Sequence, residues 1–365
     1  MSAILALMAT AVAQQAPSQS MNPNISVITD VALAAFSDTP DQRGAHDPQK
    51  NGFNLQQVEL AIGSAVDPYF RLDGNIVFAQ FGVEIEEMYA TSLALPLRSQ
   101  LRVGQFLTRF GRVNATHPHT WDFVDQPLLV GRNFGGEGNR GLGIEGSVLL
   151  PTPWFVELAV SETMADGAAT ARSFYGAEDL GVYSPLDLQT TALLEQFFEL
   201  SDNWSLLWGL SFAGGPNPSG RRNRSELYGT DVFLNYRVIT DGSWQELSLT
   251  TEWLHRRRQV PDDVLLDITG LTMATWRFSR RWAVGARYEL GTPATGLGGV
   301  AVVDPLDAEW DVRRHRSALA LTFWPTEFSR LRLQGAADTS EGEGTTFAAF
   351  TAFEFNVGAH GAHDF

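Results

Sequence analysis

The lengths of the connections between strand-like segments constrain the fold most. Short connections with turn-forming residues alternate with mostly longer, polar, Gly-rich ones. The short connections are residues 67–68, 96–99, 151–153, 201–203, 240–243, 279–281 and 325–329. Short turns on one side and long loops on the other are typical of an up-and-down transmembrane β-barrel. A soluble β-sandwich has no physical reason to sort its loops in this way.

The segments with strand-like composition number sixteen. They are residues 25–36, 53–66, 69–80, 84–95, 100–110, 142–150, 154–162, 186–199, 204–213, 227–238, 244–256, 264–276, 282–291, 313–324, 330–339 and 347–357. We therefore predict an all-β chain whose residues 22–365 form a transmembrane antiparallel up-and-down β-barrel of about sixteen strands. Its longest loop would be residues 111–141.

Side-chain alternation indicates which face of each strand meets water. In 282–291, Arg287 and Glu289 alternate with Val284, Ala286 and Tyr288. An Arg on the lipid face near the midplane costs roughly 2–4 kcal/mol, so the charged faces must line a wet lumen. Sixteen strands enclose enough space for an aqueous channel. Tryptophans next to the short turns are expected to form an interfacial girdle: Trp154, Trp204, Trp244, Trp282 and Trp324.

Composition excludes several classes of protein. The net charge is 26 − 42 = −16, which argues against a nucleic-acid partner. The absence of cysteine excludes disulfides and thiolate metal sites. The sequence contains no run of 18 consecutive apolar residues, so it predicts no membrane-spanning helix. We interpret residues 1–21 as a signal peptide and flexible N-terminus, because an apolar run ends in Ala11-Val12-Ala13, although no Lys or Arg precedes Arg43.

Residues 101–112 resemble a segment of the phosphate-selective porin O and P superfamily. The matching residues are Arg102, Val103, Gly104, Gln105, Phe106, Phe110 and Gly111. The resemblance implies a passive, substrate-selective channel, often trimeric, in the outer membrane of a Gram-negative bacterium. Phosphate selectivity is not implied, because Lys50 is the only lysine and a lysine cluster cannot be formed.

We predict that the loop of residues 111–141 folds into the lumen and sets the pore. Opposed charges across a narrow gap would select among solutes by size and charge. The candidate pore residues are Arg102, Arg109, Arg112, Asp122, Asp125, Arg132, Glu137 and Arg140. Only Arg102 of the two arginines on the adjoining strand has lumen parity. The alternative is that this loop is an exposed extracellular lid.

Sites for other chemistry are weak in the sequence. His117 and His119 have the spacing of metal ligands, but Pro118 lies between them and no third ligand is evident, so loop packing is the favoured explanation. His360 and His363 could bind Zn²⁺ loosely, or simply lie in a solvated tail. We expect no resident metal or cofactor. Without a GxSxG motif or paired acids that stand out, we expect no enzyme.

The expected function is passive diffusion of small hydrophilic solutes or ions through an outer-membrane porin, possibly a homotrimer. Alternatives are a metal (zinc)-linked uptake channel and a non-conducting structural or adhesion barrel. Partners would be the lipid bilayer and possibly lipopolysaccharide, whose phosphates pair well with Arg. The candidate arginines for that contact, or for plain solvated loops, are Arg221, Arg222, Arg224, Arg256, Arg257 and Arg258.

Overall fold

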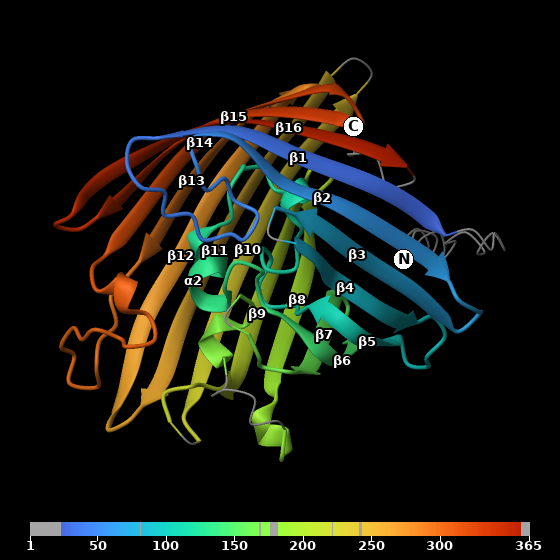
Figure 1. Ribbon diagram of the computed structural model, residues 1–365. Coiled ribbons are helices and arrows are strands. Elements are labelled where there is room, and N and C mark those ends of the chain that lie inside the picture. The colour runs from blue at the N-terminus through green and yellow to red at the C-terminus, as the bar shows by residue number, and fades with distance from the viewer. Residues whose placement is uncertain are drawn as a thin grey trace.

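Sixteen antiparallel strands close into a single β-barrel in the computed structural model (Figure 1). The structure describes residues 23–80, 82–167, 169–175, 182–220, 222–240 and 243–358. β1 pairs with β16, from Ser26 opposite Gly358 to Phe36 opposite Ala348. This closure gives each of the sixteen strands two hydrogen-bonded neighbours and confirms the predicted fold class. The predicted signal segment 1–21 and the tail histidines His360 and His363 lie outside the described residues.

The strands follow the predicted segments closely. Their bounds are β1 Asn24–Phe36, β2 Gly52–Ala65, β3 Phe70–Ala79, β4 Gly82–Ser92, β5 Ser99–Leu107, β6 Arg140–Leu149, β7 Phe155–Thr163, β8 Gln189–Ser201, β9 Trp204–Pro216, β10 Arg224–Thr240, β11 Ser243–Val260, β12 Asp263–Ser279, β13 Trp282–Gly291, β14 Arg314–Thr326, β15 Ser329–Ser340 and β16 Gly344–Gly358. Each predicted segment overlaps one strand.

Short helices lie in the connections. They are η1 Pro118–Thr120, α2 Leu128–Phe134, η2 Arg172–Phe174, η3 Pro185–Asp187 and η4 Ala308–Trp310. Figure 1 shows α2 inside the ring of strands rather than on its outer surface. In the described parts of the chain, none of the helices has the length and apolar character needed to cross a membrane.

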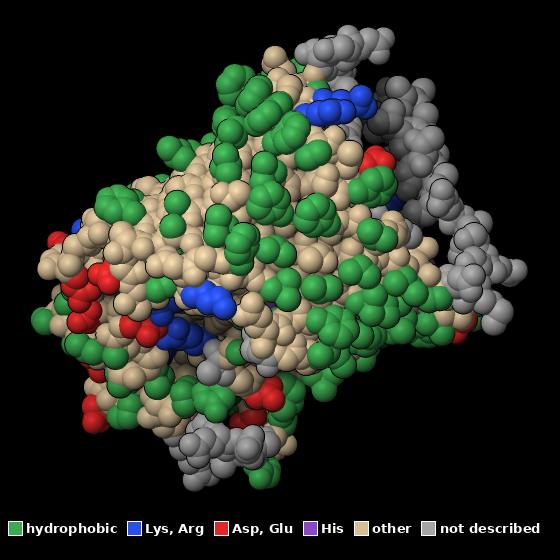
Figure 2. Space-filling model, turned by 45° about the horizontal axis from the view of Figure 1, so that its top comes forward, with side chains coloured by type: hydrophobic (Ala, Val, Ile, Leu, Met, Phe, Trp, Pro, Cys, Tyr) green, Lys and Arg blue, Asp and Glu red, His purple; other side chains and the backbone are tan. Residues whose placement is uncertain are grey.

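The two faces of the strands separate as their alternation predicts. On β13, Tyr288 is 46% exposed, whereas Arg287 and Glu289 are buried inside the barrel. On β15, Leu333 is 45% exposed and its neighbour Arg332 is buried. Figure 2 shows hydrophobic side chains spread over the outer wall, with most charged side chains toward its ends. The outer surface thus suits lipid, and the charged faces line the lumen, as predicted.

β11 and β12 are longer than predicted and correct one expectation. They are 18 and 17 residues long and continue through the region predicted as a loop, residues 257–263. Arg256 and Arg258 therefore point into the barrel, where Arg256 binds Asp267 and Arg258 binds Asp304. The interpretation that these two arginines contact lipopolysaccharide is wrong, because both are fully buried. Arg221 lies outside the described residues.

The tryptophan girdle is only partly present. Trp154 and Trp282 are 44% and 38% exposed on the outer wall. Trp244 and Trp324 instead stack on Arg277, whose guanidinium lies 4.9 and 4.6 Å from their ring centroids. Since Arg277 is itself nearly buried, these two tryptophans cannot belong to a lipid-facing girdle.

Candidate functional site

The candidate site is built around residues 111–141, called here the inward segment. Its first residue, Gly111, has φ +60°, and its N–H donates to Ser211 Oγ at 2.8 Å. The N–H groups of Arg112 and Val113 donate to Glu252 Oε2 on β11 at 3.0 and 3.1 Å. A Cβ at Gly111 would lie 2.0 Å from Glu252 Oε1, so a side chain there would displace the Glu252 carboxylate, and the positive φ also favours glycine. These contacts direct the chain from the end of β5 into the lumen.

Arginines of β15 hold the middle of the inward segment. Arg330 donates to the carbonyl oxygens of His119 and Trp121 at 2.6 and 3.0 Å. Arg332 donates to the carbonyl oxygens of Trp121 and Phe123 at 2.9 and 2.8 Å. A buried chain without regular structure needs partners for its carbonyl groups, and here the wall supplies them as charge-assisted hydrogen bonds.

Asp125 is the main ionic anchor of the inward segment. Its side chain is fully buried and accepts 2.7 Å hydrogen bonds from Arg287 of β13 and Gln334 of β15. Arg316 of β14 binds its second carboxylate oxygen. Burial alone would raise the pKa of Asp125, but the charges of Arg287 and Arg316 outweigh it and lower that pKa to about 2. Asp125 is therefore ionised at neutral pH.

Helix α2 docks by its N-terminus and by an apolar face. The N–H of Leu128 donates to Glu289 Oε1 of β13 at 2.5 Å, which places a carboxylate at the positive end of the helix. Phe134 packs edge-on against Phe110 with ring centroids 5.0 Å apart. Arg132 donates to Asp307 at 3.1 Å and lies 4.2 Å above the Trp310 ring. The loop of residues 292–313 thus closes over the helix.

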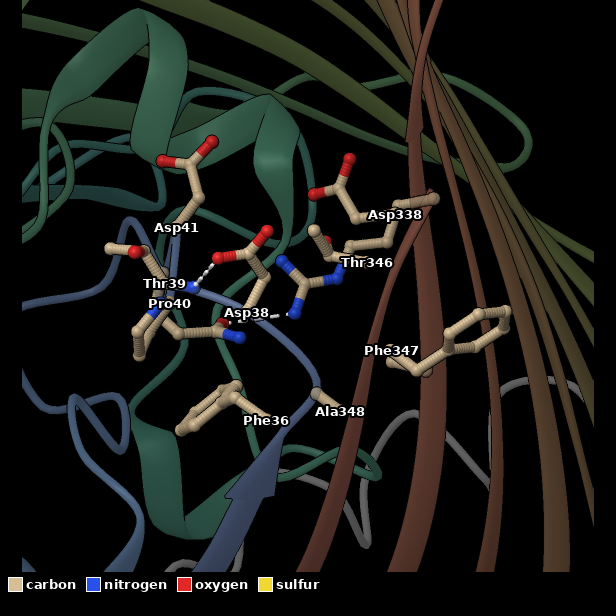
Figure 3. A pocket seen from close by; sticks show the side chains of 12 residues that line it. Phe36, Asp38, Thr39, Pro40, Asp41, Asp338, Thr346, Phe347 and Ala348 are labelled. Atoms are coloured by element: carbon tan, nitrogen blue, oxygen red, sulfur yellow. Dashed lines mark hydrogen bonds between the residues drawn. The ribbon is translucent and has the colours of Figure 1, made fainter. Parts of the chain in front are cut away.

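The loop of residues 37–51 also bends over the strand ends. Asp41 and Asp338 both pair with Arg314 of β14, and Arg316 donates to Gln42 at 2.9 Å. Figure 3 shows Asp41 and Asp338 toward one end of a small cavity, with Phe36 toward the other. This cavity lies between the loop of residues 37–51 and strands β14–β16.

A second, larger cavity lies beside the inward segment. This cavity of about 140 Å³ lies between the segment and β10–β13. Its lining includes Arg112, Thr116, Thr120, Trp121, Asp122, Phe233, Ser248, Thr250 and Met273, together with the ion-paired Asp125 and Arg287. The Arg112 guanidinium lies 3.6 Å from the centroid of the Phe233 ring, and Asp122 accepts a 2.8 Å hydrogen bond from Thr275. Of the eight predicted pore residues, Arg112 and Asp122 are half-buried beside this cavity.

The other predicted pore residues are bound to carboxylates or guanidinium groups of the wall and loops. Asp125 and Arg132 make the buried ion pairs given above. Arg102 and Arg109 both bind Glu145 of β6 at 3.0 Å, and Arg109 also binds Glu157 at 2.8 Å. Arg140 binds Glu84, and its Nη1 lies 3.5 Å from Glu137 Oε2. These six side chains hold the inward segment and its flanking strands in place.

A cluster of histidines and glutamates lies where the inward segment crosses β2–β4. His117 contacts Glu86 at 3.2 Å and Glu87 at 2.8 Å, and His119 contacts Glu59 of β2 at 2.9 Å. Burial of Glu86 and Glu87 together requires a break in alternation. β4 has a bulge there, since Asn75 pairs with Glu87 while Ile76 pairs with Ile85. The extra residue is Glu86, and both glutamates face inward.

Sequence reasoning missed this cluster although a signal was present. Two consecutive glutamates, Glu86-Glu87, interrupt an alternating strand, as Gln56-Gln57 do on β2, where a second bulge occurs. Paired polar residues in a strand indicate bulges, and bulges often occur next to functional sites. The sequence alone could not show that the bulge at Glu86 lies beside His117.

The fold and its lumen define a sixteen-stranded porin-type barrel. Similar solved structures are the trimer form of OmpT from Vibrio cholerae (TM-score 0.57, 10% identity, 92% of this chain and 99% of that chain covered) and the outer membrane channel DcaP of Acinetobacter baumannii (0.57, 12%, 92% and 96%). An anion-selective porin from Comamonas acidovorans is similar to the same degree (0.57, 10%, 92% and 99%). At these identities the similarity shows the fold alone.

The family is shown by a sequence relative. A protein of Aquifex aeolicus strain VF5, described as an uncharacterized protein, is 32% identical over 349 residues, covering 87% of this chain and 71% of that protein. The chain therefore belongs to the same family as this Aquifex aeolicus protein. No protein-family model matches the chain.

Proposed function

We propose that the chain is an outer-membrane porin through which small hydrophilic solutes or ions diffuse passively. Selection by size and charge takes place at the cavity beside Arg112 and Asp122. The observation that carries this proposal is the placement of these two oppositely charged, half-buried side chains, both from the inward segment, beside the same cavity inside the barrel. The remaining charges of the segment are already paired with the wall and contribute less to selection.

The geometry suits a filter because Arg112 is held from two sides. Its backbone N–H is bound to Glu252, and its guanidinium rests on Phe233. A fixed charge in a narrow, partly dehydrated gap acts more strongly on a passing ion than the same charge in bulk water. Cation–π contact and backbone anchoring therefore keep the positive charge where a solute must pass.

The similar porins support this proposal at the level of architecture. One of them is described as anion-selective and another as a trimer, so both properties are candidates for this chain. We propose a homotrimer in the outer membrane of a Gram-negative bacterium, with Arg222, Arg224 and the partly exposed Arg257 as remaining candidates for contact with lipopolysaccharide. We assign no catalytic reaction to it.

The resemblance of residues 101–112 to phosphate-selective porins has a structural explanation that does not involve phosphate. Gly104 has φ +141°, and a Cβ there would lie 2.2 Å from the Met88 carbonyl oxygen. The glycine allows β4 and β5 to approach closely. Membership of that superfamily stays a prediction, and the segment carries no argument about the solute.

Planar-bilayer recording of the purified full-length protein tests the proposal. We expect discrete conductance steps, and a larger step when residues 118–127 are deleted, because the deletion removes most of the segment beside the cavity. Reversal potentials in a salt gradient then give the ion preference. A protein that inserts but shows no conductance would favour the non-conducting alternative. A deletion with unchanged conductance would place the filter on the barrel wall.

A further inference from the structure

The histidine–glutamate cluster beside β2–β4 has the ligand set of a metal site. Glu59 of β2, Glu86 of β4 and His117 of the inward segment each offer one ligand atom, and these three atoms lie within 4.8 Å of one another. Glu59 and Glu86 are 0% and 4% exposed. Three elements distant in sequence therefore converge on one buried point with two carboxylates and one imidazole.

Among the described residues, no arginine is bound directly to the carboxylates of this cluster, unlike other carboxylates of the lumen. Asp125 and Glu354 have arginines bound to them. Within the described part of the chain, the ion-pair partners of Glu59, Glu86 and Glu87 are only histidines, and no Arg or Lys pairs with them. Buried carboxylates are costly unless their charge is compensated. Additional positive charge next to these three buried carboxylates would therefore stabilise them.

One oxygen of the cluster has no hydrogen-bond partner among the residues that the structure describes. Glu59 Oε2 is bound to His119 Nδ1 at 2.9 Å, whereas Glu59 Oε1 is buried without a partner. The rings of His117 and His119 are nearly parallel, at an interplanar angle of 9° with centroids 5.7 Å apart. Two protonated imidazoles would repel each other at this separation, so the histidines do not readily supply all of the missing positive charge.

We propose that Glu59, Glu86 and His117 bind a divalent transition-metal ion of the Zn²⁺ class. Carboxylate oxygen and imidazole nitrogen are ligands that Zn²⁺ favours, and three protein ligands leave a fourth position for water. A Ca²⁺ site would require six or more oxygen ligands, which this cluster does not offer. His119 acts as a positioning residue, because it contacts Glu59 rather than completing the three-ligand set.

Binding would join the inward segment to the barrel wall. Glu59 and Glu86 belong to strands, whereas His117 belongs to the segment, so one ion connects the two. A cavity of about 20 Å³, also lined by His46 and Glu137, borders Glu86 and is large enough for one water molecule. This cavity gives a small ion a place from which to approach Glu86. The proposal concerns metal binding alone and does not depend on conductance.

The test measures Zn²⁺ retention by the full-length protein in detergent. All proteins carry His360→Gln and His363→Gln, so that the tail histidines cannot contribute. After loading with Zn²⁺ and dialysis, elemental analysis should find about one ion per chain. Co²⁺ substitution should give the visible absorption of a four-coordinate site. Glu86→Gln should weaken binding at least tenfold, and so should His117→Gln. Glu343→Gln and His315→Gln, at positions outside the cluster, are matched controls and should bind normally.

Folding is checked by comparing the gel mobility of boiled and unboiled samples, because a closed barrel resists detergent until it is heated. Zn²⁺ should raise the temperature of this mobility change in the starting protein but not in a folded Glu86→Gln variant. The proposal is overturned if no Zn²⁺ is retained, or if a folded Glu86→Gln variant binds it undiminished. Loss of binding in His46→Gln and Glu137→Gln, but not in Glu59→Gln and His117→Gln, would overturn the assigned ligand set.

Discussion

Asp125 of the inward segment accepts a 2.7 Å hydrogen bond from Arg287 of β13, deep inside the barrel. Arg316 of the next strand binds the other carboxylate oxygen. One residue of a long connection thus neutralises two wall arginines, and the wall in turn fixes the connection. A change in either partner should therefore disturb the other.

Replacing Asp125 by Asn removes the negative charge but keeps the shape of the side chain. The variant should weaken the attachment of the inward segment to the barrel wall. The variant leaves Arg287 and Arg316 without their carboxylate, and removal of one partner from a buried ion pair typically costs about 3–5 kcal/mol. We expect a lower temperature for the heat-dependent gel shift and a larger or noisier single-channel conductance. Asp311→Asn, at an exposed position, should change neither measurement. Unaltered stability in Asp125→Asn would show that the ion pairs do not hold the segment.

Lowering the pH should first increase and then decrease the stability of the inward segment in its folded position. Asp47, in the loop of residues 37–51, contacts the inward segment, because its Oδ1 accepts a 2.8 Å hydrogen bond from the Gln126 N–H. Burial, together with the charge of Asp125, raises the pKa of Asp47 to about 6, so its protonation adds stability as the pH falls from about 6 to 4. The lowered pKa of Asp125, about 2, means that its stabilisation is complete above pH 4 and is lost as the pH falls toward 2. Because the folded segment restricts the pore, single-channel conductance, normalised to the conductivity of the bathing solution, should be smallest near pH 4–5.

Two variants separate these pH effects. Asp47→Asn should remove the change between pH 6 and 4, because the carboxyl that titrates there is gone. Asp125→Asn should remove the change below pH 4. Recording conductance at constant salt across pH 2–7 provides the check, and a monotonic profile in the unaltered protein would contradict the assignment.

Arg112→Glu and Arg132→Glu should have different effects, although the sequence placed both arginines at the pore. Arg112 is half-buried beside the cavity, so its replacement should move the reversal potential toward cation preference. Arg132 is 1% exposed and bound to Asp307, so a Glu there brings buried carboxylates together and should destabilise the barrel. Reversal potentials and the gel-shift temperature distinguish the two. Equal shifts in selectivity would argue against Arg112 as the filter.

Gly111→Ala should displace the start of the inward segment. Its φ of +60° is unfavourable for Ala, and the added Cβ would overlap the Glu252 carboxylate. A strained backbone of this kind costs about 1–3 kcal/mol. We expect reduced heat resistance and altered conductance. Gly335→Ala, where a Cβ meets no atom within 4 Å, is the control and should behave like the unaltered protein. A Gly111→Ala variant indistinguishable from that control would contradict this account of the turn.

The sequence by itself determined the barrel. Alternation has a period of two residues, and the lipid penalises a charged side chain on its face, so the order of residues alone assigns Arg287 and Tyr288 to opposite faces of β13. The short connections were also predictable, because turn-forming residues act through their own local backbone preferences. The predicted ends of some strands were wrong, because the local sequence pattern there pointed to a loop. The arginine run at Arg256 suggested a loop, but buried Asp267 and Asp304 allow β11 to continue.

Only the tertiary structure decided which charges meet. The sequence grouped Arg112, Asp122, Asp125 and Arg132 as opposed charges of one loop, yet Asp125 pairs with arginines more than 160 positions later in the chain. The pair Glu86-Glu87 indicates a bulge locally, but only the tertiary structure brings that bulge to His117 of the inward segment. Pairing of this kind depends on barrel closure, because closure brings distant strands around one lumen and burial then selects the partner of each charge.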